Sequence, residues 1–231
     1  MDLSIILPTY NERDNILKLV NNIEDLFTNL SYEIIIVDDN SPDGTYKFCE
    51  QNFKNKENIR TVLRLNNRGL AYSIREGIEN SSGYSIVVMD TDFTHDPMLI
   101  KKMISLVTKY EIISGSRYID GGSMENQLHG KLSYYYNMLL KFILSTKIND
   151  NLGGFFLIKR DFLYKLEFDK IFYGYGEYFF RLLYFGRKAN GKIIEIPALY
   201  KQRLHGKSKS NFFAMLFKYF FAAVKLRFTK N

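Results

Sequence analysis

The sequence predicts an α/β domain with a mostly parallel sheet and helices on both of its faces. Short apolar segments rich in β-branched residues alternate with segments of helical spacing through the first half of the chain. These strands are apolar at consecutive positions, which is typical of strands buried on both faces. A length of 231 residues with 46% hydrophobic residues suits one domain, with or without a short appendage, and a sizeable core.

The expected elements follow in order. Strands are expected at residues 3–8, 33–39, about 59–65, 84–89, 111–115, 154–159 and 193–200, and helices at 12–30, 68–79, 97–109, 129–147 and 174–187. The cluster 40-NSPDGT-45 predicts a turn, in which Pro42 is placed to open a further helix. Pro97 opens the helix that follows the fourth strand in the same way. Alternation of this kind predicts parallel strands with crossover helices.

Carboxylates follow two of the predicted strands. Asp38 and Asp39 end the second strand, and Asp90 and Asp92 follow the fourth. In sheets of this class, ligands bind in the crevice beyond the carboxyl ends of the strands. In an extended chain, residues i and i+2 point the same way, about 6.6 Å apart. Asp90 and Asp92 can therefore approach one cation, or one cation and its ligand, from the same side.

Composition narrows the class of partner. The net charge of +7 favours an anionic partner, but the absence of long basic runs argues against nucleic acid. The single cysteine, Cys49, excludes an internal disulfide and a cysteine-based zinc site, and we expect it to be a buried, inert thiol. The first residues lack a basic segment and carry Asp2, so no secretory signal is expected.

The segment 211–228 is very apolar but includes Lys218, Lys225 and Arg227. It is at the short limit for a membrane span. One interpretation is an amphipathic helix in the membrane interface, with lysines reaching the phosphates. The other is a helix that contacts the core or a second subunit. The sequence predicts a domain over 1–210 and a C-terminal amphipathic helix over 211–231.

Several motifs occur together along the chain. They are 5-IILPTYNERDNI-16, 35-IIVDDNSPDGT-45, 88-VMDTDFTHDP-97, 114-SGSRY-118, 154-GFF-156 and 203-RLHGKSK-209. Together they closely resemble the glycosyltransferases of family 2, which have the Rossmann-like GT-A fold, and within that family the dolichol-phosphate mannosyltransferases. The resemblance extends from Leu3 to about Lys209.

The resemblance implies a reaction, an inverting transfer of mannose from GDP-mannose to dolichyl or another polyprenyl phosphate, which makes a lipid-linked sugar donor. It also implies roles for individual residues. The implied nucleoside pocket is Pro8, Tyr10, Glu12, Val37 and Asp39, the metal and diphosphate motif is Asp90, Thr91 and Asp92, and the phosphate contacts are Arg117, Arg203 and Lys209. Asp90 and Asp92 would hold Mg²⁺ or Mn²⁺, and with Arg117 they form the expected catalytic set.

The acceptor side departs from the family pattern. Ser133 and Asn137 fit a motif for the acceptor phosphate, but the position of its arginine is His129. The glutamate expected in the helix after Gly174 falls near Phe180, and Glu177 lies about one turn earlier. A phosphate monoester is largely a dianion at neutral pH, so no catalytic base is expected. We assign His95 a local capping role at the start of the helix that follows it.

A lipid acceptor implies work at a bilayer surface. We expect a peripheral protein on the cytoplasmic face of a membrane, the endoplasmic reticulum if the source is eukaryotic, with small membrane-anchor subunits as further partners. Other interpretations remain open. They are a related transferase that uses UDP-glucose or another sugar nucleotide, and a non-catalytic subunit that binds a nucleotide or a lipid phosphate. Nucleic-acid binding is a third interpretation, which the charge pattern disfavours.

Overall fold

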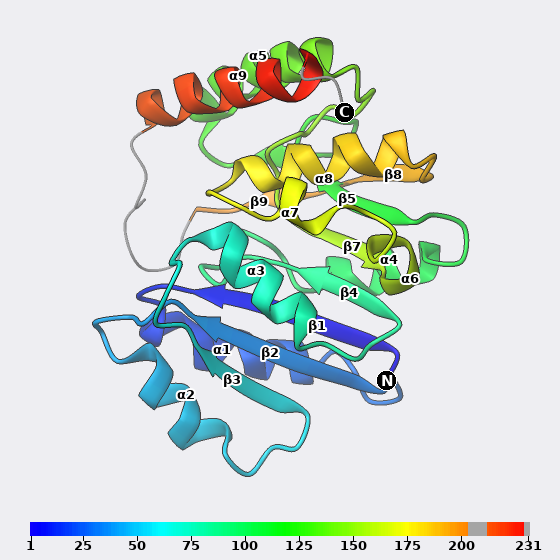
Figure 1. The fold of residues 1–231 in the computed structure, drawn as a ribbon. Coiled ribbons are helices and arrows are strands. Elements are labelled where there is room, and N and C mark those ends of the chain that lie inside the picture. The colour runs from blue at the N-terminus through cyan, green and yellow to red at the C-terminus, as the bar shows by residue number, and fades with distance from the viewer. Residues whose placement is uncertain (203–211, 229–231) are drawn as a thin grey trace.

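The computed structural model describes residues 1–202 and 212–228, so Arg203 and Lys209 lie outside the described residues. Seven strands form one sheet in the order β3-β2-β1-β4-β7-β5-β8. They are β1 (Leu3–Thr9), β2 (Tyr32–Asp38), β3 (Ile59–Leu63), β4 (Ser85–Val88), β5 (Ile112–Ser116), β7 (Phe156–Lys159) and β8 (Ile193–Pro197). A separate parallel pair joins β6 (Ser123–Met124) to β9 (Leu199–Tyr200). Figure 1 shows the sheet running through the middle of the molecule.

The sheet is mostly parallel, as predicted. β1 lies between β2 and β4 and is parallel to both, and β3 is parallel to β2. β7 runs antiparallel to β4 and β5, and β8 is parallel to β5. The carboxyl ends of β1, β2 and β4 therefore lie at the same edge of the sheet, which is where the predicted ligand crevice should lie.

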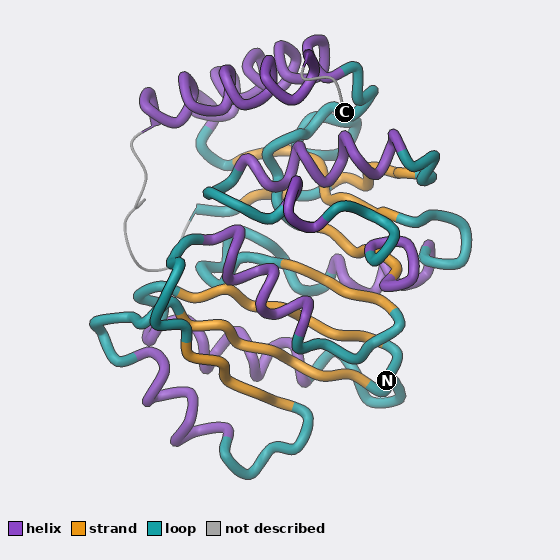
Figure 2. Tube along the Cα trace, viewed as in Figure 1, coloured by secondary structure: helices purple, strands orange, loops and turns teal. Residues whose placement is uncertain are grey.

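Helices cover both faces of the sheet (Figure 2). One face packs against α1 (Arg13–Glu24), α2 (Thr45–Phe53) and α4 (Leu99–Leu106), and the other against α3 (Leu70–Glu79), α6 (Arg160–Leu163), α7 (Phe168–Ile171) and α8 (Glu177–Lys188). Strand residues alternate between the two cores: Ile34 and Ile36 belong to the first, whereas Ile35 and Val37 belong to the second. Burial on both faces explains the unbroken apolar runs in the sequence.

A third layer is formed by α5 (Gln127–Leu144) and α9 (Phe212–Phe228), which lie side by side at the top of Figure 1. They pack with α8 around a small cluster of Leu140, Leu144, Phe180, Tyr219 and Ala223. Among these, Tyr219 and Ala223 belong to α9 and are almost fully buried. On the same helix, Phe217 and Phe221 are 68% and 66% exposed. One face of α9 therefore packs inward, and another face is open.

Some predicted boundaries were wrong. The helix expected over 12–30 ends at Glu24, and Phe27 and Leu30 pack against the core from a loop. The strand expected over 193–200 is divided, because β8 ends at Pro197 and the chain then pairs with β6 as β9. A proline has no N–H for a further ladder bond, which favours that break. The buried thiol of Cys49 is confirmed: it is fully buried, and burial raises its pKa to about 12.

Candidate active site

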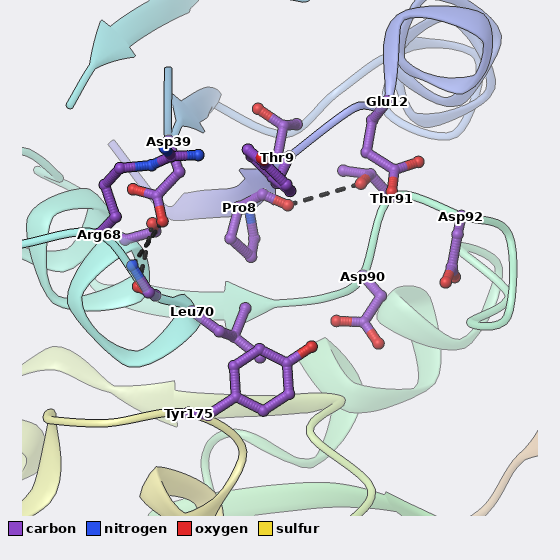
Figure 3. A pocket seen from close by; sticks show the side chains of 13 residues that line it. Pro8, Thr9, Glu12, Asp39, Arg68, Leu70, Asp90, Thr91, Asp92 and Tyr175 are labelled. Atoms are coloured by element: carbon purple, nitrogen blue, oxygen red, sulfur yellow. Dashed lines mark hydrogen bonds between the residues drawn. The ribbon is translucent and has the colours of Figure 1, made fainter. Parts of the chain in front are cut away.

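A cavity of about 440 Å³ lies beyond the carboxyl ends of β1, β2 and β4 (Figure 3). Its lining comprises Pro8, Thr9, Tyr10, Glu12, Asp39, Arg68, Gly69, Leu70, Ser73, Asp90, Thr91, Asp92 and Tyr175. Seven of the predicted site residues are among them: Pro8, Tyr10, Glu12, Asp39, Asp90, Thr91 and Asp92. A volume of this size is in the range of small-molecule and cofactor sites. The predicted crevice is therefore a formed cavity.

The acidic pair comes from the loop after β4. The backbone N–H of Asp90 donates to Nδ1 of His95, at 3.0 Å. His95 is 1% exposed and lies between two aromatic rings, stacked on Phe155 and edge-on to Tyr200. Burial lowers the pKa of His95 to about 4, despite the nearby charge of Asp92. A neutral imidazole with an unprotonated Nδ1 is the form that can accept this bond.

His95 is therefore not a helix cap, and that prediction was wrong. α4 begins without a side-chain cap, and Asp96 accepts the N–H of Met98 just before it. The sequence position next to a helix suggested capping, but the ring turns inward because it packs between Phe155 and Tyr200. Its function in the fold is to hold the backbone of Asp90 at the cavity edge.

The rest of this loop is held by hydrogen bonds of Asp92, Thr94 and Thr91. Oδ1 of Asp92 accepts hydrogen bonds from the backbone N–H and the hydroxyl of Thr94, at 3.1 and 2.7 Å. Phe93 between them has φ of +65°, a left-handed conformation that few residues other than glycine adopt. The hydroxyl of Thr91 donates to the carbonyl of Pro8 on β1, at 3.5 Å. These contacts set the directions in which Asp90 and Asp92 present their carboxylates.

At the other end of the cavity Asp39 joins two elements. Oδ1 accepts a hydrogen bond from Nη1 of Arg64 and Oδ2 accepts one from the N–H of Gly69, both at 2.6 Å. Arg64 and Asp39 are both nearly buried, with side chains 8% and 9% exposed. The neighbouring Asp38 points elsewhere and accepts from Ser41 and Thr9. Asp39 is therefore the carboxylate that faces the cavity, and Asp38 closes a turn.

Aromatic and cationic groups flank this end. The guanidinium of Arg68 lies 4.8 Å from the ring centre of Tyr10, within the range of a cation–π contact. Both residues line the cavity. Tyr175, from the loop before α8, lies across the cavity from Pro8, with its hydroxyl end toward the side of Asp90 (Figure 3). The rings of Tyr10 and Tyr175 offer flat surfaces that a planar base or a sugar ring can contact.

Arg117, from the predicted catalytic set, does not line this cavity and is paired with Asp150. Nε and Nη2 of the guanidinium each donate to one oxygen of Asp150, both at 2.8 Å. The pair is buried, with side chains 8% and 0% exposed. Burial alone would lower the pKa of Arg117, but the charge and hydrogen bonds of Asp150 raise it. Arg117 is therefore a permanent, fixed positive charge.

Of the other predicted residues, Val37 is fully buried in the second core and its side chain does not line the cavity. Ser133 is almost buried on α5, where its carbonyl and hydroxyl accept from Nδ2 of Asn137. His129 precedes it by one turn, and burial together with the charge of Arg117 lowers its pKa. His129 is therefore a neutral group near Arg117 rather than a second cation.

Asp90 and Asp92 fit a hard divalent cation. Both carboxylates line one cavity, with the hydroxyl-bearing Thr91 between them, and oxygen donors of this kind are the ones that Mg²⁺ and Mn²⁺ prefer. The side chain of Asp90 is 45% exposed, so it is open to a ligand. Within residues 1–202 and 212–228 there is no group of three or more His, Cys, Asp or Glu residues that could hold a metal ion. A substrate phosphate would have to complete such a shell.

Several residues of the site escaped the sequence analysis. They are Arg64, Arg68, Tyr175 and Asp150. Arg64 and Gly69 act through Asp39, which lies about 25 to 30 positions earlier in the chain. A glycine before the third helix was visible in the sequence, but its partner was not. Asp150 lies in an irregular stretch that carries no periodic signal.

A mostly parallel α/β sheet with a cavity and a carboxylate pair at its strand ends is typical of the α/β proteins that bind a ligand at the carboxyl ends of their strands. The model of glycosyl transferase family 2 matches residues 4–167, which is more than half of the chain. The chain belongs to glycosyl transferase family 2 and is a glycosyltransferase enzyme.

Relatives of known name support this. The chain is 33% identical over 214 residues to the dolichol-phosphate mannosyltransferase of Pyrococcus furiosus, covering 90% of this chain and 59% of that protein. It is 28% identical to the polyprenol monophosphomannose synthase of Mycolicibacterium smegmatis, covering 93% and 84%. It is also 28% identical to the undecaprenyl-phosphate mannosyltransferase of Micrococcus luteus, covering 90% and 87%. The chain thus spans less than two thirds of the Pyrococcus protein and most of the other two.

Solved structures support the fold. The glucosyl-3-phosphoglycerate synthase of Mycobacterium tuberculosis, in complex with Mn²⁺, UDP and glucosyl-3-phosphoglycerate, superimposes with a TM-score of 0.72 at 16% identity, covering 100% of this chain and 81% of that one. The same enzyme with Mg²⁺ and UDP gives a TM-score of 0.74 at 16% identity, covering 100% and 80%. The GT-A-like fold predicted from the motifs is confirmed.

Proposed function

We propose that this protein transfers mannose from GDP-mannose to a polyprenyl phosphate such as dolichyl phosphate, with inversion at the sugar carbon. One observation carries the proposal: a single cavity has Tyr10, Asp39 and Arg68 at one end and Asp90 and Asp92 at the other. The first group suits a nucleoside and the second a diphosphate. The three relatives above are named as a dolichol-phosphate mannosyltransferase, a polyprenol monophosphomannose synthase and an undecaprenyl-phosphate mannosyltransferase, which supports the proposal.

Asp90 and Asp92 would hold Mg²⁺ or Mn²⁺, and the bound cation would supply positive charge for a departing diphosphate. The solved structures named above hold Mn²⁺ or Mg²⁺ with UDP in a fold of this kind. Thr91, held to Pro8 of β1, keeps the two carboxylates at the end of β4. The chain positions the donor through the nucleoside end and leaves the sugar near the acidic pair.

On the acceptor side, Arg117 offers a fixed positive charge. Its bidentate pair with Asp150 holds the guanidinium plane still, so that an N–H not used by Asp150 can be aimed at a phosphate oxygen. An acceptor phosphate monoester is already largely ionised at neutral pH, and its oxygen can attack without losing a proton to the protein. We propose Ser133 as a further acceptor contact. Arg203 and Lys209, outside the described residues, stay as proposed diphosphate contacts.

The acceptor's apolar tail places the reaction at a membrane surface. No helix in the described part of the chain is long and apolar enough to cross a bilayer. α5 carries a stripe of exposed side chains at Leu128, Leu132, Tyr135, Leu139 and Phe142, spaced three and four residues apart. α9 beside it exposes Phe217, Phe221 and Phe228, with Lys218 and Lys225 exposed on the same helix. We propose this surface as the peripheral membrane contact, on the cytoplasmic face.

Small anchor subunits remain a second way of reaching the membrane, and the same surface would receive them. The division into a catalytic domain over 1–210 and a C-terminal interfacial helix over 211–231 is likewise a proposal. The packing of Tyr219 and Ala223 gives α9 a share of the core as well.

The decisive experiment is mass spectrometry of the products made from GDP-mannose and a short polyprenyl phosphate, with Mn²⁺ and with excess chelator. A polyprenyl phosphomannose formed with Mn²⁺ and lost with chelator supports the proposal. Parallel reactions with UDP-glucose test the alternative donor, because product from UDP-glucose alone would overturn GDP-mannose as the donor. No product from either sugar nucleotide, together with tight nucleotide binding, would favour a non-catalytic subunit.

A further inference from the structure

Helix α9 packs directly against the start of α8 and the residue before it. Nζ of Lys218 lies 2.9 Å from Oε1 of Glu177, the first residue of α8. The next residue of α9, Tyr219, packs so closely that a Cβ added to Gly176 would lie 2.4 Å from its hydroxyl. Burial of Tyr219 in the cluster with Phe180 keeps this contact in place. One turn of α9 therefore rests on residues 176 and 177.

Glu177 is a buried carboxylate with three polar partners. Its side chain is 2% exposed, and Oε1 pairs with two cations, Arg181 at 3.4 Å and Lys218 at 2.9 Å. Its second oxygen, Oε2, accepts a hydrogen bond from the backbone N–H of Tyr175, at 3.0 Å. A buried carboxylate is costly without partners, so both cations contribute to keeping it where it binds Tyr175.

The carboxylate also determines the shape of the loop. Gly174 has φ of +78°, and a Cβ there would lie 2.4 Å from Oε1 of Glu177. The carbonyl of Gly174 in turn would lie 3.1 Å from a Cβ on Gly69, whose N–H binds Asp39. A continuous line of contacts thus runs from α9 through Glu177 and Gly174 to the nucleoside end of the cavity.

Tyr175 is the part of this loop that meets the ligand space. It lines the cavity, is 38% exposed, and directs its hydroxyl toward the side that holds Asp90 (Figure 3). A phenol in this position can contact a sugar or a diphosphate oxygen of a bound donor. The backbone N–H of Tyr175 donates to Glu177, so the position of Tyr175 in the cavity wall depends on that carboxylate.

We propose that Glu177 is a positioning residue that holds Tyr175 in the wall of the donor cavity, and that Lys218 of α9 holds Glu177 in turn. The proposal deepens the proposed function, and it rests on that function where it takes the cavity as the site of a nucleotide sugar. It makes the placement of α9 and the binding of the donor interdependent. Linkage is reciprocal, so whatever binds the exposed face of α9 and shifts it changes donor affinity, and the donor changes that binding equally.

The first test needs no ligand. The chain has no tryptophan, so Tyr175→Trp places a sole indole in the cavity wall. Acrylamide quenching of that indole is compared with Lys218 intact and with Lys218→Met, which keeps the apolar stem. We expect Lys218→Met to raise the quenching constant about twofold, because the loop loosens when Glu177 loses a partner. Lys218→Arg, which keeps the charge, should return it close to the starting value.

Lys225→Met is the matched control, since Lys225 is another cation of α9, two turns further along. It should leave the quenching unchanged. Equal quenching with and without Lys218 would overturn the positioning proposal. Circular dichroism of each variant shows whether it is folded. If the Lys218→Met variant lacks a cooperative thermal transition, the same comparison is made with Lys218→Gln.

The second test is a double-mutant cycle on GDP binding, by calorimetry with Mn²⁺ and without lipid. We expect Tyr175→Leu and Lys218→Met each to weaken binding about three- to tenfold, and the double variant to be no weaker than Tyr175→Leu alone. Losses that multiply would overturn the proposal, because α9 would then act independently of Tyr175. If the unaltered chain binds no GDP while the quenching result holds, the donor assignment fails and the positioning of Tyr175 by Glu177 stands.

Discussion

Arg117 and Asp150 form a buried, bidentate ion pair, in which Nε and Nη2 of the guanidinium each lie 2.8 Å from one oxygen of the carboxylate. The backbone N–H of Arg117 donates to Asp150 as well, at 3.0 Å. The guanidinium is also flanked by the rings of Tyr118 and Tyr200, 4.9 and 4.8 Å from their centres. Arg117 is thus held by one carboxylate and by two aromatic rings.

This pair predicts a large effect of its removal. Asp150→Ala leaves a buried guanidinium without its carboxylate, and we expect the free energy of unfolding to fall by about 3–5 kcal/mol. Asp150→Asn keeps an acceptor oxygen and should lose less. Urea denaturation followed by circular dichroism measures both. A loss below about 1 kcal/mol for Asp150→Ala would mean that solvent or another group replaces the carboxylate.

The acidic pair predicts a metal-dependent change in nucleotide affinity. Asp92→Asn keeps the contacts of one side-chain oxygen with Thr94 but removes a negative ligand, so we expect GDP binding in the presence of Mn²⁺ to weaken at least about tenfold. In excess chelator the variant and the unaltered chain should bind GDP almost equally. Calorimetry with and without Mn²⁺ separates these conditions.

Asp96→Asn is the control for this prediction. Asp96 lies on the same segment but outside the cavity lining, and its side chain accepts from Met98. Its replacement should leave the Mn²⁺ dependence unchanged. Equal losses for Asp92→Asn and Asp96→Asn would show that general surface charge, and not a cation site, controls nucleotide binding.

Two glycines predict opposite responses to alanine. Gly69 has φ of +142°, and an added Cβ would lie 3.1 Å from the carbonyl of Gly174, so Gly69→Ala should destabilise the fold by about 1–3 kcal/mol. It should also weaken nucleotide binding, because the N–H of Gly69 binds Asp39. Gly130 lies inside α5 with ordinary space around it, and Gly130→Ala should stabilise by about 0.5–1 kcal/mol. Thermal melts that shift in the same direction would contradict this account.

The exposed phenylalanines of α9 predict a membrane effect separable from catalysis. Replacing both Phe217 and Phe221 by serine removes open apolar surface but leaves the packing of Tyr219 and Ala223 intact. We expect liposome binding to weaken about a hundredfold or more, since each phenylalanine that enters the bilayer contributes about 1.5–3 kcal/mol. Sedimentation with anionic and neutral vesicles measures this.

Tyr84→Ser is the matched control for the membrane prediction, because Tyr84 is 52% exposed and lies just before β4, away from α5 and α9. It should leave liposome binding unchanged. Vesicle binding that survives the double replacement would point to the α5 stripe or to an anchor subunit. The thermal midpoint of the double variant should stay near that of the unaltered chain.

Much of the site was accessible from the sequence. The pattern of apolar strands followed by carboxylates predicted the crevice, and Asp39, Asp90 and Asp92 do line one cavity. Val37 was predicted by its position in a motif, but strand alternation turns its side chain into the core. His95 was assigned from its place beside a helix, whereas packing against Phe155 turns it inward. Local position indicates which segment a residue is on, and tertiary packing decides where its side chain points.

The sequence by itself determined the seven strands of the main sheet and most of the helices, though not β6, α6 or α7. It also determined the family and the acidic pair after β4, because periodicity and short motifs are properties of neighbouring residues. Only the tertiary structure decided that Asp150 holds Arg117, that Gly69 and Arg64 share Asp39, and that Lys218 reaches Glu177. These partners lie between 25 and 41 positions apart in the chain. Their contacts arise from the order of strands in the sheet and the packing of α9 on α8, and neither leaves a periodic signal in the sequence.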